Sequence, residues 1–167
     1  MTEVQKYSVL EAKNGIEIRE YEPHILLTTL ESGSVSTAGN RAFSRLAGFI
    51  FGDNQKNQKI AMTSPVLEAP QSNGYLVSFV MPADMKVSDM PSPNPTLTIE
   101  EKAGGKFAAI RFSGFASSSL FASKEETLKH KLSQLGIDFE NAPIYARYDA
   151  PWKPGFLRRN EVLIPLT

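Results

Sequence analysis

The sequence predicts an α+β fold, a distorted antiparallel β-barrel made from two pseudo-symmetric repeats and flanked by two α-helices. The main observation is that one order of elements (two strands, a helix, two strands) occurs twice, in about residues 7–82 and 96–166. A glycine turn marks the same place in both copies, at Gly15 and at Gly105. Strands joined by short turns pair antiparallel, and the apolar faces of such a sheet need helices to cover them.

The composition supports a single domain over residues 1–167, because 41% of the chain is hydrophobic. The absence of cysteine excludes disulfides, zinc–thiolate sites and a cysteine nucleophile, and it is typical of a reducing compartment. No apolar run reaches the roughly 18 residues of a membrane helix. Eighteen basic and eighteen acidic residues give zero net charge, which argues against nucleic acid as a partner. We expect a cytoplasmic monomer without integral membrane association.

The chain should begin with a β-hairpin. Residues 7–13 and 16–21 both alternate between apolar and polar side chains, and Asn14-Gly15 between them is the strongest short turn pattern. Pro23 cannot donate a hydrogen bond to a neighbouring strand, so it should bend the chain before the strand at residues 24–30.

The first helix is predicted over residues 38–51, after a loop that ends in serine and threonine N-cap candidates and before a stop at Gly52. Its apolar arc spans roughly 220°, whereas packing on one side needs about 100°. A second apolar contact is therefore expected, either a shelf for a planar ligand or simply more protein. The apolar positions are Ala42, Phe43, Leu46, Ala47, Phe49, Ile50 and Phe51.

A second hairpin is expected from residues 59–68 and 75–81, with its turn at residues 70–74. Four prolines and little periodicity then predict an irregular connection over residues 82–95.

The second repeat should open with a hairpin of residues 97–102 and 106–112 around the turn at 103–105. The last hairpin is predicted from residues 144–148 and 161–166, joined by a long proline-rich loop.

The second helix should start at a capping box formed by Ser123 and Glu126 and end at Gly136. Its apolar stripe is narrow, and it consists of Leu128, Leu132 and Leu135. Since only the first helix has a wide apolar arc, a ligand site is expected there.

Basic side chains gather in two segments, residues 40–60 and 145–161. If these segments meet in space, their common rim would suit an anionic ligand. No nucleophile elbow, phosphate loop or zinc-binding HExxH motif is present, so we expect no catalytic residues and no resident metal site.

Three segments resemble a known family. Residues 59–66 (KIAMTSPV) and 148–162 (YDAPWKPGFLRRNEV) look like the two signature blocks of the SOUL haem-binding protein family, and residues 15–21 (GIEIREY) resemble its N-terminal strand. The likeness follows the same order over nearly the whole chain. It implies a barrel of two repeats with two helices, and haem or a related tetrapyrrole bound in an apolar cleft beside the first helix.

The resemblance also implies site residues. By position, Ala47, Phe49 and Ile50 match apolar pocket positions, and Lys153 matches a basic residue of the last loop. Relatives have basic residues where this chain has Asn40 and Gly48, so two proposed propionate contacts are missing, for which Arg41 or Arg45 could substitute. The candidate binding residues are Ala42, Phe43, Arg45, Leu46, Ala47, Phe49, Ile50, Met62, Trp152, Lys153, Phe156 and Arg158.

Several alternatives stay open. Trp152 and Phe156 could close over a ligand or pin their own loop, and Glu161 with one neighbouring arginine is expected to form a structural ion-pair network. His24 and His130 are not well placed to ligate haem iron. Without a strong axial ligand, haem would be exchangeable, as in a carrier, buffer or sensor. The alternatives are a module that binds another amphipathic molecule or a partner helix, and a hydrolase or tetrapyrrole-modifying enzyme.

Overall fold

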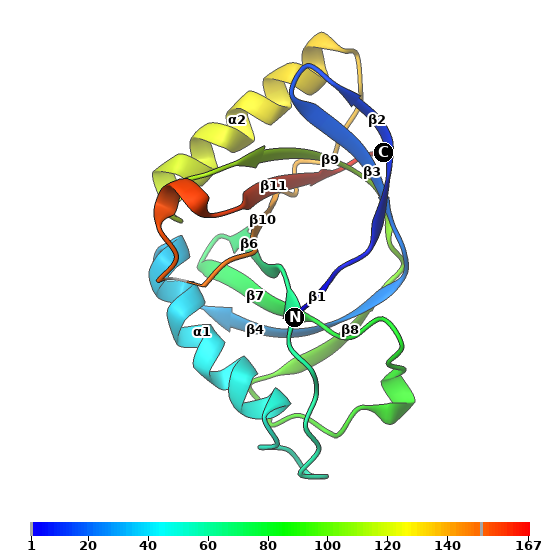
Figure 1. The fold of residues 1–167 in the computed structure, drawn as a ribbon, viewed down its shortest axis with the longest axis vertical. Coiled ribbons are helices and arrows are strands. Elements are labelled where there is room, and N and C mark those ends of the chain that lie inside the picture. Colours follow the sequence, from blue (N-terminus) through cyan, green and yellow to red (C-terminus); the bar gives the residue numbers. More distant parts are fainter. Residues whose placement is uncertain (1, 151) are drawn as a thin grey trace.

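The protein is described by a computed structural model that covers residues 2–150 and 152–167 (Figure 1). Pro151, which belongs to the second signature block, lies outside the described residues. The helices are α1 Val35–Ile50 and α2 Ser118–Gln134, with single turns at η1 Val87–Asp89 and η2 Gly155–Leu157. The strands are β1 Glu3–Val4, β2 Tyr7–Lys13, β3 Ile16–Tyr21, β4 His24–Glu31, β5 Thr63–Ser64, β6 Val66–Gln71, β7 Gly74–Val80, β8 Thr98–Lys102, β9 Gly105–Phe112, β10 Ile144–Arg147 and β11 Asn160–Pro165.

Nine strands form one antiparallel sheet in the order β2-β3-β9-β11-β10-β6-β7-β4-β8. The sheet curls into a distorted barrel with α1 and α2 on its outside (Figure 1). The predicted α+β fold is therefore confirmed. The sequence did not indicate the small additional pair of β1 and β5, which is parallel.

The predicted hairpin of residues 97–112 does not form, because β8 and β9 do not pair with each other. Instead, β3 continues into β4 and β8 continues into β9, and these two long bent segments lie antiparallel along both halves of the sheet. They cross where Tyr21 lies opposite Gly105 and His24 lies opposite Lys102. Gly104, at the bend, has a φ of +79° and lies directly against the backbone of Tyr21. Gly104 thus allows a close crossing of strands, and the two glycines do not make a hairpin turn.

The other hairpins agree better with the sequence. Asn14 and Gly15 take positive φ angles of 52° and 77° between β2 and β3, and β10 pairs with β11. The β6–β7 turn is shorter than predicted, since Pro70 still lies in β6 opposite Tyr75. Residues 59–62 are not a strand either: after α1 the amide of Ile60 donates to the carbonyl of Ile50, so the chain follows the helix end before it joins the sheet.

Helix α1 begins three residues before the predicted start. Ser34 is its N-cap and accepts a hydrogen bond from the amide of Thr37, whose hydroxyl accepts one from the amide of Ser34. This reciprocal pair satisfies two amides that the first turn leaves without partners. The helix ends as expected before Gly52, which has a φ of +116°.

Helix α2 begins five residues before the predicted capping box, because Ser117 is its N-cap. Ser123 lies inside the helix, and its carbonyl accepts a hydrogen bond from the Thr127 hydroxyl. The extra turn places Phe121 in the core, stacked on the ring of Tyr145 at a centroid distance of 4.7 Å. The two rings are 24 positions apart in sequence. Their contact stabilises the early helix start, and it outweighs the local capping pattern at Ser123.

The two helices cover different parts of the sheet: α1 packs on β4 and β7, and α2 packs on β9 and β11. Each lies over one apolar cluster. The inner face of the sheet holds two smaller apolar clusters together with buried charged side chains, of which Arg19 and Glu161 are the largest. In the described part of the chain, no helix is long and apolar enough to cross a membrane.

Candidate functional site

A cleft of about 590 Å³ lies beside the N-terminal half of α1. Its other walls come from residues 62–66 and from the segment between β10 and β11, which runs past the start of α1 (Figure 1). The position of α1 is fixed by hydrogen bonds to the segment that leads into α2: Ser36 donates to the carbonyl of Ala116, and Ser118 accepts from the amide of Val35. The side chains that face the cleft include Asn40, Phe43, Met62, Val66, Arg147, Trp152 and Arg158.

Four of the predicted binding residues meet in this cleft. Phe43 is 43% exposed and rests on Phe79, and Met62 lies across the cleft on the strand side. Trp152 and Arg158 come from the last loop. The guanidinium of Arg158 lies 4.9 Å from the ring centre of Phe115, and its Nε donates to the carbonyl of Lys153. The two basic segments approach each other here only through uncharged residues of the first, because Arg41 and Arg45 pair with Glu31 and do not line the cleft.

Five other predicted residues lie between α1 and the sheet and not in the cleft. Phe49 is only 1% exposed, and the four remaining side chains are buried in the same apolar cluster. Hence the wide apolar arc of α1 mainly contacts protein, since β4, β7 and the buried side chains of Ile60, Met90 and Leu97 pack in the same cluster. The five residues are Ala42, Leu46, Ala47, Phe49 and Ile50.

The remaining predicted residues are engaged or lie apart. Arg45 forms an ion pair of 2.6 Å with Glu31, on the other side of α1 from the cleft wall. Lys153 forms one of 2.8 Å with Asp149 and is thereby held by its own loop. Phe156 is largely exposed and is not among the residues that line the cleft.

A buried ion pair at the floor of the cleft has no counterpart among the predicted residues. Arg147 Nη2, at the end of β10, lies 2.6 Å from Glu68 Oε1 on β6. Glu68 is fully buried, and burial raises the pKa of its carboxyl to about 7 despite the attraction of Arg147. Glu68 is the one charged residue of β6, whose sequence is VLEAPQ. Its partner could not be predicted, because 78 residues separate the two positions.

Helix α1 accommodates this pair only because residue 39 is glycine. A Cβ at Gly39 would overlap Arg147 Nη2 and lie 2.7 Å from Glu68 Oε1. A larger residue here would push Arg147 toward the cleft and separate the two charges.

We therefore expect Gly39→Ala to lower the free energy of unfolding by about 1–3 kcal/mol through overpacking. Gly48→Ala in the same helix is the matched control, since the nearest atom, Asp53 Oδ2, is 4.0 Å from the added carbon. That change should stabilise the protein by up to about 1 kcal/mol, because alanine favours the helix. Urea unfolding of both variants checks the difference, and equal effects would contradict the close contact at Gly39.

Behind the cleft, Tyr148 connects the loop to the charged network of the barrel interior. Its hydroxyl donates to Glu161 Oε1 at 2.8 Å, and the guanidinium of Arg159 lies over its ring at 3.9 Å. Burial and the neighbouring carboxylate of Glu161 raise the pKa of the Tyr148 hydroxyl well above its usual value. Tyr148 is therefore a neutral hydrogen-bond donor. As predicted, Glu161 and one arginine, Arg159, belong to a structural network.

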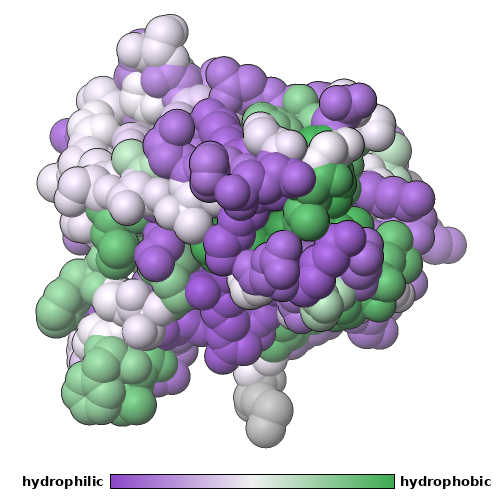
Figure 2. Space-filling view, turned by 90° about the horizontal axis from the view of Figure 1, so that it is seen from above, coloured by the Kyte–Doolittle hydropathy of each residue, from purple (hydrophilic) through white to green (hydrophobic). Residues whose placement is uncertain are grey.

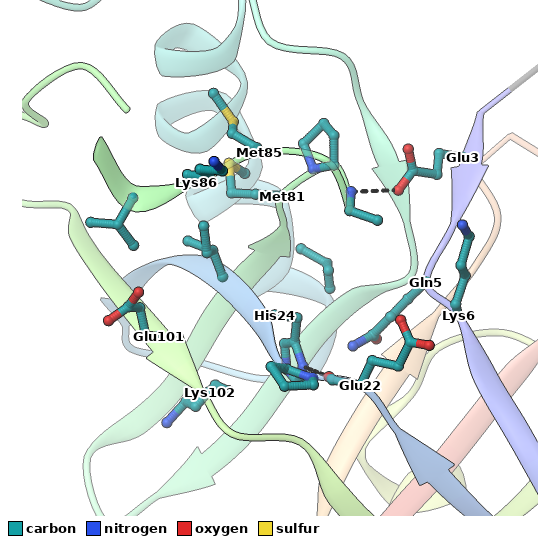
Figure 3. A pocket seen from close by; sticks show the side chains of 16 residues that line it. Glu3, Gln5, Lys6, Glu22, His24, Met81, Met85, Lys86, Glu101 and Lys102 are labelled. Atoms are coloured by element: carbon teal, nitrogen blue, oxygen red, sulfur yellow. Dashed lines mark hydrogen bonds between the residues drawn. The ribbon is translucent and has the colours of Figure 1, made fainter. Parts of the chain in front are cut away.

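The two histidines lie elsewhere. His24 lines a second, smaller cavity of about 290 Å³, where its Nδ1 lies 2.8 Å from the carbonyl of Glu22 (Figure 3). Met81 and Met85 lie on the far side of that cavity. His130 is exposed on α2. Among the described residues, no group of three or more histidine, aspartate or glutamate side chains could hold a metal ion.

Large apolar side chains project from the surface close to the cleft. Trp152 is 86% exposed, and three further residues of the two neighbouring loops are also exposed: Phe115, Phe156 and Leu157. Figure 2 shows apolar groups standing out at one edge of a face on which polar residues surround a further apolar area. The amide of Gly114 donates to the carbonyl of Gly155 and ties the two loops together.

Comparison with protein families gives one match over almost the whole chain, the SOUL heme-binding protein family, at residues 2–165. Among curated proteins, "Heme-binding protein 1" of Xenopus tropicalis is 33% identical over 164 residues, which are 90% of this chain and 84% of that protein. "Heme-binding protein 2" of Mus musculus is 31% identical over 156 residues, 87% of this chain and 75% of that protein. These relatives are named for binding haem and not for a reaction.

Solved structures share the fold at low sequence identity. The C-terminal domain of EcmrR superposes with a TM-score of 0.69 at 10% identity, over 96% of this chain and 98% of that domain. A hydrolase from Listeria innocua superposes with a TM-score of 0.62 at 8% identity, over 95% of this chain and 94% of that chain. At such identities the likeness shows the architecture alone.

Proposed function

Because the chain belongs to the SOUL heme-binding protein family, we propose that it binds haem or a related tetrapyrrole in the cleft beside α1. The observation that carries this proposal is the meeting of Phe43, Met62 and Trp152 with two arginines around one cavity. Binding sites for small molecules combine apolar walls with a few polar groups that fix orientation.

The residues present suit a tetrapyrrole. The cavity of about 590 Å³ lies within the range of roughly 300–1,000 Å³ that is usual for ligand sites. Apolar side chains would contact the faces of the ring, and Arg147 and Arg158 would hold its carboxylates. Bound haem would supply an iron centre. The chain itself contributes the apolar walls and the positive charge at the floor and rim.

We propose further that the haem is exchangeable, as suits a carrier, buffer or sensor. His24 and His130 both lie away from the cleft, and Met62 is the sulfur side chain at its wall. In cytochromes c methionine ligates haem iron together with a histidine, and neither histidine of this chain lines the cleft. We expect the protein to act as a cytoplasmic monomer without nucleic acid, in line with its zero net charge.

A haemin titration tests the proposal directly. The Soret band and the fluorescence of Trp152, the single tryptophan, should change and saturate near one equivalent of haemin. Phe43→Asp should weaken binding at least tenfold, because an ionised side chain would have to be desolvated against the ring. Phe51→Asp is the matched control, since Phe51 is 63% exposed at the end of the same helix and does not line the cleft. No saturable change in the wild-type protein would overturn the proposal.

The second candidate function is a module that binds another amphipathic molecule in the same cleft. It is favoured by Asn40, an uncharged side chain that lines the cleft at the start of α1. A thermal-shift screen separates the two candidate functions. The second is supported if haemin leaves the melting temperature unchanged while another ligand raises it.

A further inference from the structure

The ion pair at the floor of the cleft links the proposed ligand site to a buried carboxyl. Arg147 lines the cleft and its side chain is 16% exposed, so part of this side chain is open to a ligand. Glu68 lies behind it, fully buried and covered by α1 at Gly39. Arg147 is therefore placed between a ligand group in the cleft and an internal carboxylate.

The hydrogen bonds of this pair are incomplete. Both carboxylate oxygens of Glu68 and the Nε of Arg147 are buried. Within residues 2–150 and 152–167, none of these three atoms has a well-oriented hydrogen-bond partner. A buried charge with unmade hydrogen bonds is costly, since water can no longer solvate it. Two changes would lower this cost: a second anion for Arg147, and a proton for Glu68.

Arg147 is the one cationic group that faces Glu68 in the described structure. On β10, Tyr145 lies directly opposite Glu68, but its hydroxyl donates to Glu125 Oε1 at 2.6 Å on α2. On β7 the residue opposite is Val77. On α1 the covering position is Gly39, whose buried neighbours on the helix are apolar. The charge state of Glu68 thus depends mainly on burial and on Arg147.

We propose that Arg147 and Glu68 form a proton-linked anchor, in which a carboxylate of the cleft ligand pairs with Arg147 while Glu68 takes up a proton from solution. The inference rests on the proposed function, because the carboxylate it invokes is that of a tetrapyrrole. The step is balanced: Arg147 stays protonated, the ligand stays anionic, and Glu68 changes from carboxylate to carboxylic acid.

The direction of the pH effect follows from linkage. Burial already raises the pKa of Glu68 to about 7 with Arg147 as its partner, and a second anion on Arg147 would raise it further. Below pH 6 Glu68 is protonated before the ligand arrives, so binding needs no extra proton. Above pH 7 each binding event takes one up, and affinity should fall by up to tenfold per pH unit. For the wild-type protein we expect haemin to bind about tenfold more weakly at pH 8 than at pH 6.

Glu68→Gln provides the main test, because its amide cannot titrate. For each protein we take the ratio of the haemin Kd at pH 8 to the haemin Kd at pH 6. This ratio should be about ten times larger for the wild-type protein than for Glu68→Gln. The pH behaviour of haemin itself affects both proteins equally, so the comparison cancels it. Equal ratios would overturn the inference while leaving haem binding intact. Absence of saturable haemin binding in the wild-type protein would overturn the proposed function and this inference with it.

A second measurement needs no variant. Calorimetry at pH 7.5 in two buffers of different ionisation enthalpy counts the protons taken up when protoporphyrin IX binds. We expect an uptake of at least half a proton. The dimethyl ester of the same porphyrin, which has no carboxylate, should give none and should bind more weakly. The anchor would be contradicted if protoporphyrin IX bound without proton uptake, or if its dimethyl ester caused the same uptake.

Discussion

Replacing Glu161 by glutamine should lower the free energy of unfolding by about 3–5 kcal/mol, since it removes the buried counter-charge that the buried Arg19 and the partly buried Arg159 share. Arg19 donates to both carboxylate oxygens, at 2.8 and 2.6 Å, and Arg159 Nη2 donates to Oε2 at 3.0 Å. Tyr148 donates to Oε1 as well. Glu161 and Arg19 are almost completely buried on the inner face of the barrel, so water cannot replace these partners.

Urea unfolding at pH 7 measures this effect, with Glu126→Gln as the control. Glu126 is 76% exposed on α2, where such a change usually alters stability by less than about 0.5 kcal/mol. An effect of Glu161→Gln no larger than that of the control would show that the network is not important for stability.

The pH dependence of the same pair gives an independent check. Burial would raise the pKa of Glu161, but hydrogen bonds and charge from Arg19 and Arg159 outweigh it and hold this pKa below its usual range. The stabilisation is therefore complete above the pKa of the unfolded chain and is lost as the pH falls through the lower folded value. Wild-type stability should decline in acid more steeply than that of Glu161→Gln, which has no carboxyl to protonate at this position.

Gly104→Ala should also destabilise the protein strongly, by about 3–5 kcal/mol, because the two long bent strands cross at this point. A Cβ at Gly104 would overlap the carbonyl oxygen of Tyr21 and lie 2.7 Å from the carbonyl carbon of Glu22. Both obstacles are backbone atoms of the facing strand, which a rotamer change cannot move. The positive φ of 79° adds strain of about 1–3 kcal/mol for any residue with a side chain.

Gly105→Ala separates the two causes. Gly105 has a φ of +123°, which is at least as unfavourable for alanine, but no atom lies within 4 Å of the added carbon. Its loss of stability should reflect backbone strain alone and remain about 1–3 kcal/mol smaller than that of Gly104→Ala. Similar midpoints for the two variants in thermal or urea unfolding would contradict the close crossing of the strands.

Local patterns predicted most of the elements but not how the strands pair. Asn14-Gly15 was correctly identified as a hairpin turn, because its positive φ angles are a property of the two residues themselves. The glycines at 104 and 105 look the same in sequence but lie where two strands cross, and Gly104 allows their close approach. Their role differs from that of Asn14-Gly15 because the adjoining strands pair with strands distant in sequence. β8 pairs with β4, and β9 pairs with β3 and β11. The internal duplication of residues 7–82 and 96–166 stays a prediction.

By itself the sequence determined the fold class and the family. These depend on signals carried by neighbouring residues: alternation in strands, helical periodicity, turn glycines and two contiguous blocks. Only the tertiary structure decided that Phe49 faces the sheet while Phe43 faces the cleft, because a wide apolar arc does not reveal which of its sides is covered. It also decided that Arg147 pairs with Glu68 beneath Gly39, since a pair so distant in sequence is set by strand register and by the fit of one helix on the sheet.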